Sequence, residues 1–288
     1  AAAFDLEDEA FGARAEAVEG NLRHLGERGH VGGDGGIGFA VEGKGQVLGV
    51  GGLAAGGLDP DLVVSTGDSI ASPDALEPLL GSLGRLLDAP GVFVFGSNDY
   101  FAPRSANPVK YLLRRRSPTV YNTNGRRELP WEQLRDGLEG CGWEDLTHRR
   151  AVLDVNGYRL AFRGTDDAHL NRDDYPLVAG PPDDEADLNI GVTHAPYLRV
   201  IDGMAADGMD LILAGHTHGG QVCVPFYGAL VTNCDLDTAR VKGMSSHTCG
   251  GHTAHMHVSA GLGTSPYAPY RFACRPEVTL LTLRPRSS

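Results

Sequence analysis

The chain has 288 residues, 41% of them hydrophobic and 22% charged, and its net charge is −12. These values are typical of a globular protein with one large domain or two, and the negative charge argues against a nucleic-acid-binding protein. The chain has no run of about 18 apolar residues, and residues 1–20 lack the regions of a signal peptide, so we expect a cytoplasmic protein. The five cysteines are expected to be reduced thiols, although Cys223 and Cys234 flank an expected hairpin and could pair.

Residues 1–57 differ from the rest of the chain. An acidic, helix-prone start is followed by a glycine-rich stretch, residues 31–57, which has no clear strand or helix periodicity. Ordering so much glycine costs conformational entropy, so we expect this stretch to be poorly ordered or irregularly packed. We therefore separate residues 1–57 from a domain at 58–288. The segment is either a flexible tail or a diverged or corrupted stretch, such as a translated frame error.

The domain is predicted to open with a strand, a helix and a second strand. Residues 61–66 form a short apolar run that ends in Gly67-Asp68, and residues 91–95 form another that ends in residues 96–99, Gly-Ser-Asn-Asp. Such runs are typical of buried strands. Between them, Ser72-Pro73 is a typical helix start, and leucines follow at helical spacing.

Residues 103–140 are expected to form an excursion that covers the site as a lid. The first part is rich in Pro, Arg and Tyr, and residues 131–140 are amphipathic. A basic group lies within this excursion: Lys110, Arg114, Arg115 and Arg116. Two interpretations stay open. The group is either a solvated helix face or a surface that meets a phosphate group or an anionic membrane, which would make the protein peripheral to a membrane.

The second half of the chain contains two more buried strands. A hairpin turn is expected at Asn156-Gly157. Residues 188–193 form an apolar run that ends in His194, and residues 211–214 form one that is followed by His216 and His218. A helix is expected between these two strands, over residues 196–207.

Four predicted strands thus carry metal-ligating side chains at their carboxyl ends. Open α/β sheets place their chemistry at this edge. The set mixes oxygen and nitrogen ligands, which suits a borderline cation such as Mn²⁺, Fe²⁺, Zn²⁺ or Co²⁺ better than Ca²⁺ or Mg²⁺. The predicted metal ligands are Asp68, Asn98, His194, His216 and His218.

In chain order, the motifs Gly-Asp, Gly-Ser-Asn-Asp, Thr-His and Gly-His-Thr-His-Gly-Gly resemble those of the calcineurin-like metallophosphoesterases. The resemblance runs from about residue 58 to residue 283. It implies an α/β fold with two mixed sheets packed as a sandwich between flanking helices. It also implies two divalent metal ions, which Asp68 would bridge. Asn98, His194 and His216 would complete the shell of one ion, and His218 would belong to the other.

The chain departs from the family pattern in two places. The family opens with a D-x-H motif that supplies the first metal's ligands, and no such motif precedes Asp68. In addition, residues 96–99 read Gly-Ser-Asn-Asp where the family usually has Gly-Asn-His-Asp. An ungapped alignment would make Ser97 the ligand, but Asn98 is the more ordinary ligand. The His that usually protonates the leaving group is then absent, and Asp99 or His169 would have to replace it.

The resemblance implies an enzyme that hydrolyses a phosphoester or pyrophosphate with the help of metal ions. The expected partner is an anionic phosphoester, and the basic group within 103–140 favours a lipid-linked one. The alternative is a binding protein on the same fold with weakened or no activity, because the first motif and the usual His are missing.

Overall fold

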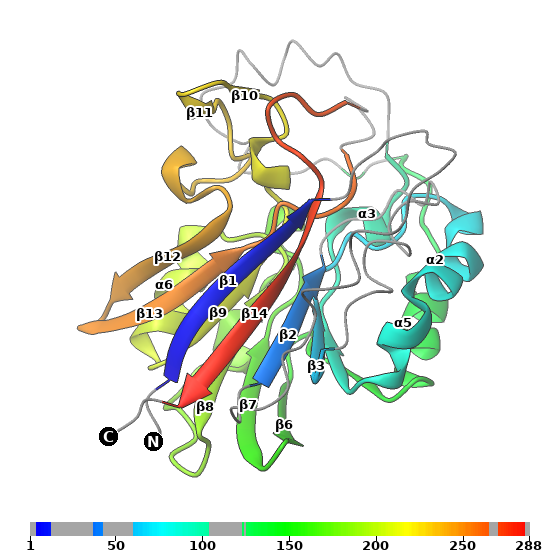
Figure 1. The fold of residues 1–288 in the computed structure, drawn as a ribbon. Coiled ribbons are helices and arrows are strands. Elements are labelled where there is room, and N and C mark those ends of the chain that lie inside the picture. Colours follow the sequence, from blue (N-terminus) through cyan, green and yellow to red (C-terminus); the bar gives the residue numbers. More distant parts are fainter. Residues whose placement is uncertain are drawn as a thin grey trace, which may run out of the picture.

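The computed structural model describes residues 60–103, 123, 125–264 and 270–285, together with the backbone of two strands at 4–12 and 37–42. Two six-stranded mixed sheets pack face to face, and helices cover their outer faces (Figure 1). The predicted α/β sandwich of two mixed sheets with flanking helices is therefore confirmed.

The first sheet has the order β1-β14-β2-β3-β4-β5. Strands β2 to β5 run parallel to one another, whereas β14 runs antiparallel to both β1 and β2. The strands are β1 (Phe4–Gly12), β14 (Glu277–Pro285), β2 (Ile37–Glu42), β3 (Leu62–Ser65), β4 (Gly91–Phe93) and β5 (Trp143–Asp145).

The second sheet has the order β12-β13-β9-β8-β7-β6, with four parallel strands between two antiparallel edges. The strands are β12 (Gly243–Cys249), β13 (His252–Val258), β9 (Leu211–Ala214), β8 (Leu188–Thr193), β7 (Tyr158–Gly164) and β6 (Arg150–Val155). The predicted turn between β6 and β7 is present, and Asn156 and Gly157 both have positive φ, as a tight hairpin turn requires. A small hairpin of β10 (Cys223–Val224) and β11 (Gly228–Ala229) stands apart from both sheets.

Helices α2 and α5 cover the first sheet, and α6 covers the second. The helix predicted to start at Ser72-Pro73 is confirmed as η1 followed by α2, and the helix predicted within residues 196–207 is α6. The helical elements are η1 (Pro73–Ala75), α2 (Leu76–Leu83), η2 (Gly84–Asp88), α3 (Ser97–Tyr100), α5 (Trp131–Glu139), η3 (Ala168–Leu170), η4 (Tyr175–Leu177), α6 (Leu198–Ala206), η5 (His218–Gly220) and η6 (Thr238–Arg240).

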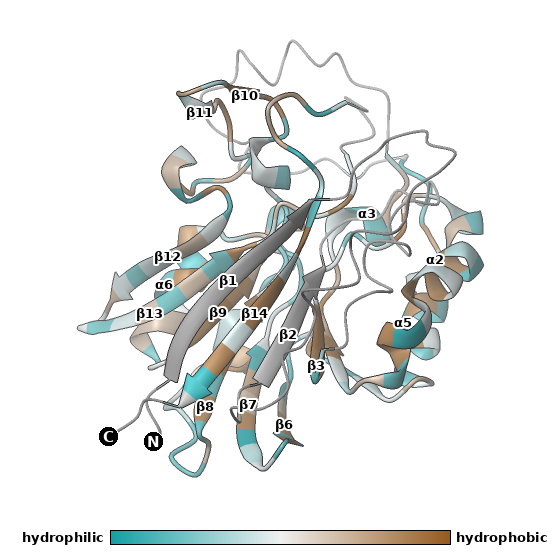
Figure 2. Ribbon diagram, viewed as in Figure 1, coloured by the Kyte–Doolittle hydropathy of each residue, from teal (hydrophilic) through white to brown (hydrophobic). Residues whose placement is uncertain are grey.

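The main core lies between the two sheets. Leu62 and Val64 of β3 face this core together with Leu160 and Ile190 of the second sheet, whereas Val63 faces the layer of α2 and α5. Strand β3 is therefore buried on both faces, which explains its continuous apolar sequence. Figure 2 shows β3 as hydrophobic along its length, while α2 and α5 carry hydrophilic residues as well.

Two expectations about the N-terminal segment are wrong where the structure describes it. Residues 4–12, expected to favour a helix, form β1, which pairs with β14 over nine residues. Residues 37–42, expected to lack regular structure, form β2 between β14 and β3. Pairing with distant strands outweighs the local preference. The division at residue 57 stays a prediction, because most of the segment lies outside the described residues.

The expected lid is described only in part. The basic group of Lys110, Arg114, Arg115 and Arg116 lies outside the described residues. Helix α5 packs against α2 and β5, and the ring centroid of Trp131 lies 5.4 Å from that of Tyr100. This part of residues 103–140 thus belongs to the outer helical layer. Cys223 and Cys234 are both free thiols, so the disulfide considered between them is absent.

No helix within the described ranges is long and apolar enough to cross a membrane. This finding agrees with the lack of a long apolar run in the sequence.

We predict that Leu160→Ala lowers the free energy of unfolding by about 2–5 kcal/mol, because Leu160 is fully buried between the sheets and its removal leaves a cavity. Urea denaturation measures the change. The matched control is Leu177→Ala, since Leu177 is 64% exposed and its truncation is expected to change stability by less than about 0.5 kcal/mol. Equal losses in the two variants would contradict this account of the core.

Candidate active site

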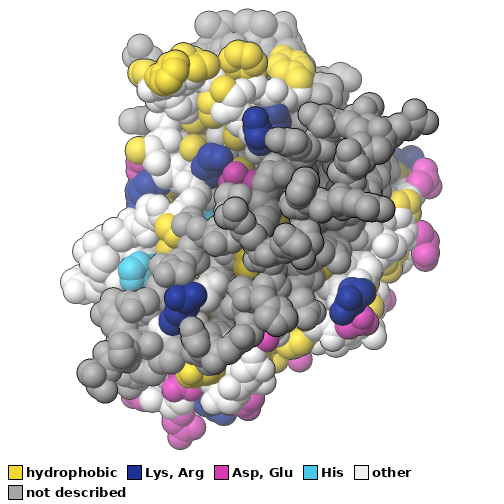
Figure 3. All heavy atoms as spheres, in the orientation of Figure 1, with side chains coloured by type: hydrophobic (Ala, Val, Ile, Leu, Met, Phe, Trp, Pro, Cys, Tyr) yellow, Lys and Arg dark blue, Asp and Glu magenta, His cyan; other side chains and the backbone are white. Residues whose placement is uncertain are grey.

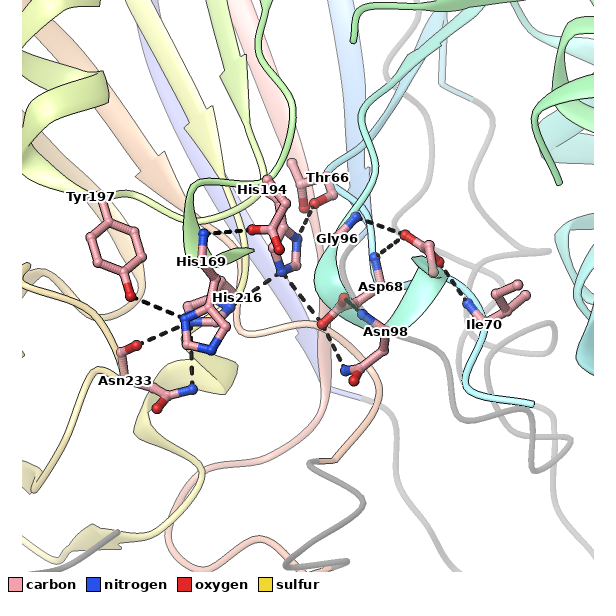
Figure 4. A network of polar contacts seen from close by, with 12 residues as sticks. Thr66, Asp68, Ile70, Gly96, Asn98, His169, His194, Tyr197, His216 and Asn233 are labelled. Carbon is pink, nitrogen blue, oxygen red and sulfur yellow. Dashed lines mark hydrogen bonds and ion pairs between the residues drawn. The ribbon is translucent and has the colours of Figure 1, made fainter. Parts of the chain in front are cut away.

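The predicted ligands come together because the strands that carry them end at the same edge of the sandwich. Strands β3 and β4 are parallel neighbours in one sheet, and β8 and β9 are parallel neighbours in the other. The loops after these four strands therefore meet, as Figure 4 shows for Asp68, Asn98, His194 and His216.

Four of the five predicted ligands form one chain of contacts. The side-chain Nδ2 of Asn98 donates to Asp68 Oδ2 at 3.0 Å, and the same oxygen lies 3.4 Å from His194 Nε2. His194 Nε2 in turn lies 3.2 Å from His216 Nδ1. All four side chains are buried. His218 is also buried, in η5, two residues beyond His216.

The outer nitrogens of the two histidines face backbone carbonyls. His194 Nδ1 lies 2.7 Å from the carbonyl oxygen of Thr66. His216 Nε2 lies 3.2 Å from the carbonyl oxygen of Asn233, which is closer than the side-chain Nδ2 of the same residue at 3.5 Å. A carbonyl only accepts hydrogen bonds, so each of these ring nitrogens carries the proton when the ring is neutral.

When both rings are neutral, the inner nitrogens, His194 Nε2 and His216 Nδ1, therefore both present lone pairs. They face each other at 3.2 Å, and Asp68 Oδ2 adds a third acceptor at 3.4 Å from His194 Nε2. Three acceptors this close together repel one another unless a cation, either a metal ion or a proton on one ring, lies among them. Ligating histidines typically direct their other nitrogen to a carbonyl or carboxylate, as both do here.

The chemistry of this donor set fits a divalent metal ion. Neighbouring ligands about 2.1 Å from one ion lie roughly 3.0–3.4 Å apart, which matches the two separations around His194. Within the described ranges, however, no group of three or more His, Cys, Asp or Glu side chains has the geometry of a ready-made metal site. The residues that follow β2, where the family's first motif would stand, lie outside those ranges.

Asp99 holds the site's loops together. Its Oδ2 accepts hydrogen bonds from the backbone N–H groups of Asp68 at 2.6 Å and Gly96 at 2.8 Å, and its Oδ1 accepts one from Ile70 at 3.0 Å. Burial raises the pKa of Asp99 to about 6. Because the backbone engages both oxygens, the geometry favours a positioning role for Asp99. The acid role remains an untested prediction.

The structure places His169 beside the predicted ligands. Its ring centroid lies 4.4 Å from that of His216, and its Nδ1 lies 3.0 Å from the hydroxyl of Tyr197. The side chain of Asp167 accepts the backbone N–H of His169 at 2.8 Å, which fixes the start of η3. His169 therefore approaches the ligand cluster from the loop after β7.

Sequence reasoning did not identify three groups that support the site. Tyr197 orients His169, Asn233 orients His216, and the carbonyl of Thr66 orients His194. Backbone carbonyls leave no trace in a sequence. Tyr197 and Asn233 belong to no motif, and only the folded chain shows which ring each one contacts.

Arg271 plays a comparable role for the loop that carries His218. Its guanidinium donates to the carbonyl oxygen of His218 at 3.0 Å and, on the other side, to those of Ala260 at 2.7 Å and Gly261 at 2.9 Å. Burial lowers the pKa of Arg271. These bonds tie the His218 loop to the loop after β13.

Comparison with known proteins agrees with this geometry. Residues 48–220, more than half of the chain, match the family model of the calcineurin-like phosphoesterases. The chain belongs to this family. Because the family consists of phosphoesterases, the protein is a phosphoester hydrolase. Members of the family generally use divalent metal ions.

Several relatives carry related names. The uncharacterised metallophosphoesterase YkuE of Bacillus subtilis is 31% identical over 235 residues, which cover 78% of this chain and 68% of YkuE. The phosphodiesterase YaeI of Escherichia coli is 36% identical over 147 residues, or 51% of this chain and 49% of YaeI. The solved 5'-nucleotidase precursor of Thermus thermophilus aligns with 78% of this chain and 49% of its own length, at 13% identity and a TM-score of 0.43. The similarity to the 5'-nucleotidase precursor is too low to support an argument.

We predict that Gly96→Ala weakens metal binding. A Cβ atom at this position would collide with the Asp68 carboxylate and with the His194 ring, so both donors would have to move. We expect the affinity for Mn²⁺, measured by isothermal titration calorimetry, to fall about 10–100-fold, the range seen when the surroundings of metal ligands are disturbed. The control is Gly81→Ala in α2, where a Cβ meets no atom within 4 Å. Unchanged affinity in Gly96→Ala would refute the proposed donor set.

Proposed function

We propose that the protein hydrolyses phosphodiesters or pyrophosphates with two divalent ions, which Asp68, Asn98, His194, His216 and His218 help to hold. The observation that carries this proposal is the set of three facing acceptors on Asp68, His194 and His216. When bound, such ions polarise the phosphoryl oxygens and lower the pKa of a water molecule. The mixed nitrogen and oxygen donors favour Mn²⁺, Fe²⁺, Zn²⁺ or Co²⁺.

His169 is the group that we propose to protonate the leaving group. Its ring lies against that of His216, and the Tyr197 hydroxyl holds one of its nitrogens. Asp99 is the other candidate from the sequence, but its three bonds to backbone N–H groups hold it as a carboxylate that accepts rather than donates.

The substrate is proposed to be an anionic phosphoester, and a lipid-linked one is favoured by the basic group of Lys110, Arg114, Arg115 and Arg116 in the sequence. Such a group suits both a phosphate and an anionic membrane surface. A chain with a net charge of −12 needs local positive charge of this kind to attract an anion.

The rival function is that of a binding protein on this fold with weakened or absent catalysis. The observation in its favour is the missing D-x-H motif. Strand β2 lies parallel to β3, with Glu42 paired in register with Ser65, so its carboxyl end points to the edge that carries Asp68. The D-x-H motif of the family would stand directly after this strand, and the sequence there lacks it. Metal content separates the two functions, since an enzyme of the proposed type holds about two ions per chain.

We predict that His216→Ala removes a metal ion and abolishes metal-dependent turnover. Elemental analysis after Mn²⁺ loading is expected to give about two ions per wild-type chain and fewer in the variant. Hydrolysis of bis(4-nitrophenyl) phosphate is expected to fall more than about 100-fold. His255→Ala is the control, because His255 is exposed on β13. No metal and no turnover in the wild type would favour the binding protein.

The roles of His169 and Asp99 are separated by the leaving group of the substrate. Alkyl phosphodiesters need a proton donor, whereas nitrophenyl esters hardly do, and such assistance is typically worth about 10²–10⁴-fold. His169→Gln is expected to slow alkyl substrates by this factor and nitrophenyl substrates far less. Asp99→Asn is expected to slow both equally, because it loosens the Asp68 loop. A selective loss on alkyl substrates in Asp99→Asn would instead assign the acid role to Asp99.

A further inference from the structure

We propose that an exposed hydrophobic rim beside the active site docks the protein on the surface of an anionic lipid bilayer. The inference concerns binding alone and does not depend on the proposed hydrolysis. The rim is formed by Val224, Phe226, Tyr227, Leu230, Tyr270 and Phe272.

The rim is one connected platform. The hairpin of β10 and β11 lies beside the segment that contains Phe272. The backbone N–H of Cys223 donates to the carbonyl of Phe272 at 2.9 Å, and the N–H of Phe272 donates to the carbonyl of Gln221 at 3.0 Å. Gln221 also donates from its side chain to the carbonyl of Tyr270 at 3.1 Å. Two segments far apart in the sequence thus present their side chains together.

The exposure of these side chains is concentrated at this one place. Eight large hydrophobic side chains are exposed among the described residues, and six of them belong to the rim. Tyr227 is 78% exposed, and Phe226 is fully exposed. Figure 3 shows hydrophobic side chains gathered at the top of the molecule, the end where Figure 1 labels β10 and β11. Contiguous apolar surface of this kind is typical of an interaction site.

Phe226 also has an unusual backbone conformation. It follows Pro225 at the tip of the hairpin with φ of 66°, a region that glycine and asparagine adopt easily and bulky residues avoid. The ring is not buried inside the protein, so no packing offsets the cost of this backbone conformation. An aromatic residue at a strained and exposed tip is explained by contact with something outside the chain.

Charge points to an anionic lipid surface as the occupant. Residues 214–234 and 257–276 contain no Asp or Glu, although the chain has 37 of them. Arg275 is exposed beside the rim. Three acidic residues border these ranges. Asp237 pairs with Arg240 at 2.6 Å and Glu277 pairs with Lys242 at 2.9 Å, while Asp235 accepts the backbone N–H of Leu198 at 2.9 Å. Aromatic tips next to an exposed arginine, on segments that lack acidic residues, suit the interface of a bilayer with anionic headgroups.

The position of the rim gives docking a consequence for the site. Strand β10 begins three residues after η5, which carries His218. A protein docked through the rim therefore presents the edge with Asp68, His194 and His216 toward the headgroup layer.

The test is co-sedimentation of the full chain with vesicles of phosphatidylglycerol mixed with phosphatidylcholine, compared with vesicles of phosphatidylcholine alone. The wild type is expected to bind the anionic vesicles. The double variant Phe226→Ser, Tyr227→Ser is expected to have an affinity for them that is lower by at least about tenfold. Leu177→Ser is the matched control, because Leu177 is 64% exposed on η4 and lies outside the rim. Circular dichroism establishes that all three chains are folded.

Two outcomes overturn the proposal. One is that the wild type does not bind anionic vesicles, or that the double variant binds them as tightly as the wild type does. The other is a wild-type dimer that the double variant breaks, since the rim would then cover a second copy of the chain. Hydrolysis of bis(4-nitrophenyl) phosphate without vesicles is measured in parallel. Turnover in a protein that does not bind vesicles refutes the docking proposal and leaves the proposed hydrolysis standing.

Discussion

The lone pairs of His194 and His216 face each other across 3.2 Å, with the carboxylate of Asp68 alongside, and much of the surrounding structure holds them there. The carbonyls of Thr66 and Asn233 fix the orientation of the two rings. Gly96 leaves room for the Asp68 carboxylate to approach His194. Bringing three acceptors this close together is electrostatically unfavourable, so the protein supports the arrangement through contacts made elsewhere.

Backbone strain is concentrated at the same place. Asp68, His216 and His218 all have positive φ, with values of 62°, 69° and 53°. Such conformations disfavour residues with a side chain, and they persist only where neighbouring structure enforces them. Asp99 enforces the first through the N–H of Asp68, and Arg271 enforces the last through the carbonyl of His218. Both residues thus serve the site without being placed among the metal donors.

The sandwich explains why ligands from distant parts of the sequence meet. Strands β3 and β4 belong to one sheet and β8 and β9 to the other, and the core between the sheets fixes their relative position. The same edge carries the loops to His169 and to the β10–β11 hairpin. Chemistry and the hydrophobic rim are therefore neighbours, because both are built from segments that leave the sheets at their carboxyl ends.

The sequence by itself determined the features that depend on local pattern. Short apolar runs fixed β3, β4, β8 and β9, and the polar residues directly after them predicted the site, because a strand and its next few residues are covalently adjacent. Only the tertiary structure decided the rest. Strand β1, in the acidic start, forms by pairing with β14, and strand β2, in the glycine-rich stretch, forms by pairing with β14 and β3; no local pattern in either segment encodes this pairing. Likewise, the partners of His169 and His216 and the backbone bonds of Asp99 arise from contacts between distant loops, so their roles follow from packing rather than from spacing.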